Sequence, residues 1–438
     1  MEFQKIKLHR SEKNRAAVTQ ITLDDDYNVP DYRQDIVKVI KERGELRFDE
    51  VKAMEGAAWI KGSLVFKVLY RSDKQEGKIS CLRGEIPFQE RLNMDGLSEY
   101  DAVHATGDME DLTIGVINSR KLNVRAVIVL TASSEKEVDE ELTCELSDGS
   151  SYEQNIVEKE ALKLLVVRRD ICRQKSEAVL PSSKPNIREI LWQSMQLRNV
   201  ESRLVEGKIR LSGEILVSIL YNDEEEGEHL SWYETTVPLD AQAECGVMED
   251  DCIWQVQMVP LTMELEVKPD YDGEERILVM ELALDTHIRI WKEEKIRLLT
   301  DLYSLQKEVK PVFRECPLER LLVKNAAKCR MTEQMELKED KEKVLQICSC
   351  EGKVLLERQE IKPDGVLAEG TVEVNILYIT PDDHMPVGAV QEIYPFSQLV
   401  EIPEMSAQAK VELDASLEQL SAVMPDQEHV EIRAAVRL

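Results

Sequence analysis

The sequence predicts a mainly β protein built from three tandem β-sandwich-like repeats, each with a short helical segment. Two observations predict this fold: a strand motif that occurs three times with the same internal spacing, and apolar side chains that alternate with period two inside that motif. The length of 438 residues also accommodates about three domains of ordinary size.

The repeated motif begins with a glycine and ends with a tyrosine eight residues later. A proline then follows each tyrosine at a distance of 17 residues. The three sets of landmarks are Gly62, Tyr70 and Pro87; Gly213, Tyr221 and Pro238; and Gly370, Tyr378 and Pro395. The glycines are 151 and 157 residues apart. Because both spacings recur three times, we infer the duplication of one unit and place the units at residues 1–151, 152–308 and 309–438.

The motif has the pattern of a half-buried antiparallel strand. In the first copy Leu64, Phe66 and Val68 share one face with Tyr70, and the same face is apolar in the other copies. The opposite face is mixed. We expect each tyrosine to bury its ring and to direct its hydroxyl toward the end of the strand. The glycine suits a bend or a close approach of two backbones.

Helical segments are expected where apolar residues recur three positions apart. Such segments precede each motif, at residues 35–39, 186–190 and 343–347, and a longer helical period covers residues 158–168. Turn-rich sequence after each tyrosine predicts a hairpin loop in every unit.

Composition limits the classes of function. The chain has 56 Lys and Arg against 85 Asp and Glu, a net charge of −29. This charge repels nucleic acid and anionic lipid, so neither is an expected partner. The sequence has neither an apolar run of about 18 residues nor a signal-peptide core, so we expect a cytoplasmic protein without direct membrane insertion. Nine irregularly spaced cysteines without a CxxC pair fit reduced thiols.

The sequence contains no common catalytic, nucleotide-binding or metal-binding motif. The six histidines do not recur at equivalent positions of the repeat. The acidic runs at residues 24–26 and 224–226 lack the alternating ligands of a calcium loop. We therefore expect no catalytic residue, no cofactor and no metal site, and we expect that the protein is not an enzyme.

Several segments resemble a known family. Those in the second unit are Pro185–Leu191, Glu206–Ile209, Gly213–Tyr221 and Val237–Leu239, and the first unit adds Asn118–Val124. They resemble the SPOCS domain of spore coat morphogenetic proteins such as SipL. The resemblance implies three SPOCS-like repeats and a role in assembly of the spore envelope, in the mother cell around the forespore.

The resemblance also bears on partners. SipL-like proteins contact the coat ATPase SpoIVA through a C-terminal LysM domain. The last expected strand ends at Leu438, and we expect no LysM-like segment. The resemblance therefore implies other spore envelope proteins as partners. A contact with SpoIVA would have to form without the LysM domain through which SipL-like proteins make it.

These observations favour a non-catalytic scaffold or adaptor of spore coat assembly that acts through protein–protein contacts. One alternative is a module that binds cell-wall glycan, although aromatic residues make up only 5% of the chain. A second alternative is a hydrolase whose acidic site is dispersed in the sequence.

A candidate contact surface is the loop after Tyr221. Loops can take on partner-specific chemistry because they do not have to keep the pattern of a strand. The loop of the second unit is the most acidic of the three. Its carboxylates are Asp223, Glu224, Glu225, Glu226 and Glu228. We expect this loop to be exposed and to dock a cationic partner; the other interpretation is a solubilising hairpin.

Overall fold

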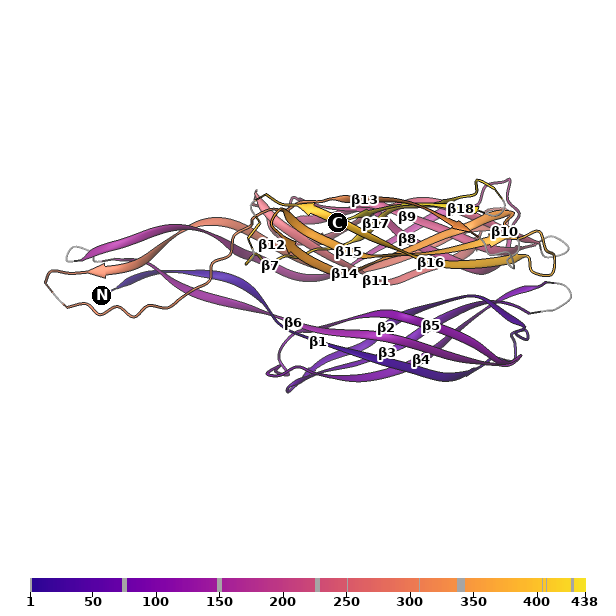
Figure 1. Cartoon of the computed structure of the whole chain (residues 1–438), viewed down its shortest axis with the longest axis horizontal. Helices are drawn as coiled ribbons and strands as arrows, with labels where there is room; N and C mark the ends of the chain where they lie inside the picture. The colour runs from indigo at the N-terminus through magenta and orange to yellow at the C-terminus, as the bar shows by residue number, and fades with distance from the viewer. Residues whose placement is uncertain are drawn as a thin grey trace.

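In the computed structural model the chain forms six antiparallel sheets of three strands each (Figure 1). The structure describes residues 2–72, 77–147, 152–224, 229–249, 251–306, 308–336, 343–403, 405–406, 408–426 and 429–438. Within these residues there are eighteen strands and no helix. The expectation of a mainly β chain is confirmed, and the expectation of helical segments is wrong.

The sheets pack face to face in pairs, and the first pair is made by the first six strands. These are β1 (Phe3–Asn28), β2 (Lys38–Met54), β3 (Ala57–Arg71), β4 (Ile79–Asn93), β5 (Val103–Asn118) and β6 (Lys121–Leu146). Sheet β1-β6-β5 packs on sheet β2-β3-β4 around one apolar core. Phe66 from one sheet and Ile128 from the other are both fully buried in it.

The second pair repeats this order. Its strands are β7 (Glu153–Val179), β8 (Ile187–Val205), β9 (Lys208–Asp223), β10 (Leu230–Glu244), β11 (Cys252–Pro269) and β12 (Glu275–Tyr303). Sheet β11-β12-β7 packs on sheet β10-β9-β8.

The third pair has shorter outer strands. Its strands are β13 (Lys328–Glu336), β14 (Gln346–Lys362), β15 (Gly365–Ile379), β16 (Val387–Glu401), β17 (Ser416–Val423) and β18 (His429–Arg437). Sheet β13-β18-β17 packs on sheet β14-β15-β16. The three sandwiches are called the first, second and third units below. The unit boundaries given above stay a prediction of the sequence.

The repeat motif is the middle strand of its sheet in each unit, and its glycine lies opposite a β-bulge. The register of the preceding strand shifts beside Gly62, Gly213 and Gly370. A Cβ atom on Gly213 would lie 2.9 Å from the carbonyl oxygen of Arg198, and one on Gly370 would collide with that of Leu355. The bulged backbone approaches so closely that a side chain at this position would force a shift.

The repeat prolines Pro87, Pro238 and Pro395 lie on the edge strands β4, β10 and β16, where sheets tolerate proline. The residue after each proline pairs with the repeat glycine: Phe88 with Gly62, Leu239 with Gly213 and Phe396 with Gly370. The spacing from tyrosine to proline is therefore constant because the two strands pair in the same hairpin register in every unit.

The tyrosine hydroxyls bind the segments that lead into β2 and β8. Tyr70 donates to the carbonyl of Gln34 at 3.2 Å, and Tyr221 donates to that of Pro185 at 3.1 Å. Both rings are fully buried, and burial raises the pKa of Tyr70 to about 12. The third tyrosine, Tyr378, is also buried. In the first two units the hydroxyl thus ties the end of the motif strand to the preceding connection.

Two arginines that are not among the residues expected from the sequence hold the same connections. Arg276 donates to the carbonyls of Pro181 at 2.6 Å and Lys184 at 2.9 Å. Arg120 makes the equivalent bond to Pro30 at 2.8 Å. The available signal was an arginine that recurs after 156 residues, at the start of the last strand in each of the first two units.

The expected helices fail because irregular strands imitate their spacing. Residues 35–39, 186–190 and 343–347 form the entries into β2, β8 and β14, and residues 158–168 lie inside β7. In β8 an extra residue at Arg188 puts Ile187 and Ile190 into one cluster. In β7 a bulge at Leu165 resets the alternation. A β-bulge thus brings residues three apart onto one face, as a helix does.

Two ribbons extend from the sandwiches as an arm, at the left of Figure 1. β5 reaches only to Ser134 of β6, and β11 reaches only to Lys292 of β12. Beyond these residues β1 pairs with β6, and β7 pairs with β12, and no other described residues add a third strand. The ribbons pack on each other through a small core of Leu8, Leu142, Ala161 and Ile296. Residues 304–327, the connecting segment, join β12 to β13.

Candidate protein-binding site

The three units meet at one apolar cluster, called the axis cluster. It includes Leu69, Leu220 and Leu377, each directly before a repeat tyrosine and at most 1% exposed. These leucines are 151 and 157 residues apart, as are the repeat glycines. They lie on the face of the motif strand that the sequence shows as mixed. The units therefore contact one another through equivalent positions.

A buried carboxylate beside the axis cluster also joins all three units. Glu351 of β14 lies 3.2 Å from Nζ of Lys41 and 3.2 Å from Nη1 of Arg43, both on β2. It accepts a hydrogen bond of 3.1 Å from the indole Nε1 of Trp192 on β8. Burial by itself raises the pKa of Glu351, but the charges of Lys41 and Arg43 hold it below its usual value. The carboxylate is therefore ionised, and its partners come from the other two units.

These residues make the three contacts different from one another. Each of Lys41, Trp192 and Ser349 pairs with the leucine before a repeat tyrosine, so the three occupy equivalent positions. The positions two residues further on hold Arg43, Ser194 and Glu351. The first position thus holds a cation, an indole and a hydroxyl in the three units, and the second holds a cation, a hydroxyl and a carboxylate. These differences distinguish the three units from one another where they meet. This set has no signature in the sequence, because its members differ from one unit to the next.

The three loops that follow the repeat tyrosines begin and end at the axis cluster. The residues that flank them belong to it: Leu69 and Ile79, Leu220 and Leu230, and Leu377 and Val387. Arg71 donates to the carbonyl of His384 at 3.1 Å, which joins the first and third loops directly. We call this end of the molecule the three-loop end. It lies opposite the arm, because β6 begins beside Arg120 at this end and its other end lies in the arm (Figure 1).

The acidic loop of the second unit divides into a structural and an exposed part. Asp223 is 2% exposed, and its Oδ1 accepts a hydrogen bond of 3.1 Å from the backbone N–H of His229, so it closes the hairpin. Glu224 is exposed and accepts a bond of 3.3 Å from Asn186. Glu225, Glu226 and Glu228 lie outside the described residues. Docking of a cationic partner here stays a prediction.

A second polar interface joins the units near the base of the arm. Glu135 lies 3.2 Å from Nε2 of His287, accepts a hydrogen bond from Ser11 and lies 3.8 Å from Arg289. Arg289 also lies 3.0 Å from Glu412 of the third unit. Burial alone raises the pKa of Glu135, but His287, Ser11 and Arg289 together lower it to about 2.

The described residues contain no group of three or more His, Cys, Asp or Glu arranged to hold a metal ion. A helix long and apolar enough to cross a membrane is likewise absent from the part of the chain that the structure describes.

Comparison with known proteins identifies the family. The model of the SipL SPOCS domain matches the chain at residues 35–117, 186–268 and 343–424, together more than half of its length. The matches begin 151 and 157 residues apart, the same offsets as the repeat glycines. No curated protein matches the chain. The family suggests a sporulation-related role, and the SPOCS domain is not a known family of enzymes. The chain belongs to the SPOCS-domain family of SipL-like proteins.

Proposed function

We propose that this protein is a non-catalytic scaffold of spore envelope assembly that binds partner proteins through the three-loop end. The observation that supports this proposal most is the gathering of three different loops around one buried cluster. A partner seated there touches all three units, so the covalent repeat supplies three contacts at once.

The charge of the three-loop end favours a cationic partner. Glu224 and Asp383 are exposed in the loops, and Asp31 is fully exposed in the connection beside Tyr70. Charges on the rim of an interface mainly steer association and set its salt dependence. A basic segment of another envelope protein has the complementary chemistry.

The test is charge reversal in the full chain. The variant carries Glu224→Lys, Glu225→Lys and Glu226→Lys. The control carries the same change in charge on exposed strand positions of the arm, at the opposite end of the molecule, Glu137→Lys, Glu141→Lys and Glu153→Lys. Each chain is used as bait in an extract of sporulating cells, and captured proteins are identified at two salt concentrations.

We expect the wild type and the control to retain a basic partner that the loop variant loses. If capture and its salt dependence are the same in all three, the acidic loop is only a solubilising hairpin. Capture of cell-wall fragments without a protein supports the glycan-binding alternative instead. The expected location, cytoplasmic at the forespore surface, stays a prediction that imaging of the labelled protein tests.

A further inference from the structure

The outer edge of β7 in the arm has backbone groups without a strand partner. Leu162 donates its N–H to the carbonyl of Glu319 in the connecting segment at 2.7 Å. Backbone groups alternate in direction along a strand, so the N–H groups of Glu160 and Glu158 point to the same side as that of Leu162. Among the described residues, no further backbone bond joins this edge to the connecting segment toward the tip of the arm.

The chain's own connecting segment cannot continue the pairing as a regular strand. It meets β7 at Glu319, whereas Pro317 accepts a hydrogen bond from Arg10 of β1 and Arg314 pairs with Glu140 of β6. The segment contains Pro311 and Pro317. Proline has no N–H to donate, so each proline removes a bond from a ladder. The edge of β7 is therefore left open next to a segment of the same chain.

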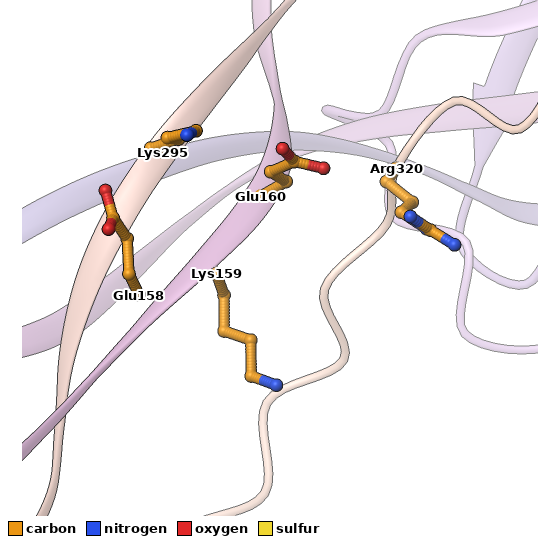
Figure 2. Close-up of a pocket in the computed structure, with 5 residues that line it drawn as sticks. All are labelled: Glu158, Lys159, Glu160, Lys295 and Arg320. Atoms are coloured by element: carbon orange, nitrogen blue, oxygen red, sulfur yellow. The ribbon is translucent and has the colours of Figure 1, made fainter.

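An opening of about 410 Å³ lies between this edge and the connecting segment, and Figure 2 shows the five charged residues that line it. They are Glu158, Lys159, Glu160, Lys295 and Arg320. None of the five forms an ion pair with another described residue. Lys159 comes from β7 and Arg320 from the connecting segment, so two unpaired cations lie on the two sides of the opening (Figure 2).

The same segment exposes large apolar side chains close to the tip of the arm. Val312 is 98% exposed, Leu305 is 87% exposed and Phe313 is 69% exposed. Three such residues within nine positions are unusual on a surface whose strands alternate apolar and charged residues. They are exposed to a partner chain that reaches this segment.

We propose that the outer edge of β7 binds an extended segment of a partner protein, which adds to the arm as a strand. Backbone bonds to Glu158 and Glu160 hold the segment. Its apolar side chains contact Val312 and Phe313. An acidic side chain of the segment lies between Lys159 and Arg320, two of the lining cations that have no ion pair among the described residues. The partner segment is thus extended, acidic and apolar.

A second copy of the chain is a poor occupant of this edge. Two identical antiparallel strands are related by a twofold axis that passes through one pair of identical residues. Near the centre of the opening that pair is Glu158 with Glu158, Lys159 with Lys159 or Glu160 with Glu160. Like charges directly opposite each other destabilise a strand pair.

The inference is independent of the proposed function, because the arm and the three-loop end are at opposite ends of the molecule. The probe is an acetylated and amidated octapeptide of alternating valine and glutamate, and its control replaces glutamate by lysine. The protein is the full chain. Binding is measured by titration, and hydrogen exchange reports on the amides of Glu158 and Glu160.

Two variants distinguish the contribution of the backbone N–H to binding from that of the side chain at one position. Glu160→Pro removes the outward N–H, which an edge strand tolerates, and Glu160→Ala keeps it. We expect the glutamate peptide to bind about tenfold more tightly than the lysine peptide and to slow exchange at both amides. Glu160→Pro weakens binding about tenfold, whereas Glu160→Ala does not weaken it.

A third variant, Arg320→Glu, lies on the connecting segment and does not depend on the tolerance of β7 for proline. It is expected to reverse the preference between the two peptides. Equal binding of both peptides, unchanged amide exchange, or equal affinity of Glu160→Pro and Glu160→Ala overturns the proposal. If the wild-type chain forms a dimer and Glu160→Pro abolishes that dimer, the occupant is a second copy of the chain and not a segment of another protein.

Discussion

The indole of Trp192 in the second unit donates a hydrogen bond of 3.1 Å to the carboxylate of Glu351 in the third, while the ammonium group of Lys41 in the first lies 5.3 Å from the centre of the same ring. One small buried cluster thus contains a residue from every unit. It connects residues that are up to 310 positions apart in the chain.

Removing this carboxylate tests how strongly the units depend on one another. Glu351→Ala leaves Lys41 buried without its counter-charge, and we expect a loss of about 3–5 kcal/mol in the free energy of unfolding. Urea denaturation of the full chain measures it. Glu357→Ala, at an exposed position of the same strand, is the control and should change the value by less than about 0.5 kcal/mol. Equal effects of both variants would show that the buried pair does not hold the units together.

The repeat glycine gives a second prediction. In Gly370→Ala the new Cβ meets the carbonyl oxygen of Leu355 and lies 2.9 Å from ring atoms of Phe396. We expect a loss of about 1–3 kcal/mol, because the hairpin and its bulge must move apart. In Gly115→Ala the Cβ meets no atom within 4 Å, so this variant should be neutral or slightly stabilising. Thermal unfolding compares the two, and a lower melting temperature for Gly115→Ala would contradict the argument.

Arg276, which holds the connection before β8, gives a third prediction. Arg276→Met removes charged hydrogen bonds to the carbonyls of Pro181 and Lys184 but keeps much of the side-chain volume. Bonds of this kind contribute about 1.5–3 kcal/mol, and we expect a loss in that range. Hydrogen exchange should also accelerate in residues 180–186. Arg203→Met, at a side chain that is 71% exposed, is the matched control. This role of Arg276 is refuted if exchange in this connection stays at the rate of the wild type.

The depressed pKa of Glu135 predicts a loss of stability in acid. The folded pKa of about 2 lies below the ordinary value of 4.5, so the unfolded state takes up the proton first. The stabilisation from Glu135 is therefore fully present above a pH of about 4.5 and is lost as the pH falls toward about 2. The difference in melting temperature between the wild type and Glu135→Gln should be large at pH 7 and should shrink at pH 3.

The control for this titration is Glu137→Gln, which changes an exposed carboxylate two residues away. Its melting temperature should follow that of the wild type over the whole pH range. A constant difference between the wild type and Glu135→Gln from pH 7 to pH 3 would mean that the carboxylate is not stabilised by its partners.

The sequence by itself determined the features that depend on local spacing. Alternation along Leu64, Phe66 and Val68 predicts a strand, because neighbouring side chains of a strand point to opposite faces. The register of a hairpin fixes the number of residues from each tyrosine to its proline, so this number is the same in all three units. The helical expectation for residues 186–190 failed for a local reason as well, since a bulge at Arg188 imitates helical spacing.

Only the tertiary structure decided what lies between the units. Leu69 follows Lys67 on its face of the motif, and its burial depends on a cluster that includes Leu220 and Leu377 of the other units. Glu351 is one of many carboxylates in the sequence, and only packing places two cations and an indole around it. Contacts between distant residues leave no period in a sequence. They are set by the way in which finished sheets pack, and that packing buries both faces of each motif strand: one in its own sandwich and the other at the common axis.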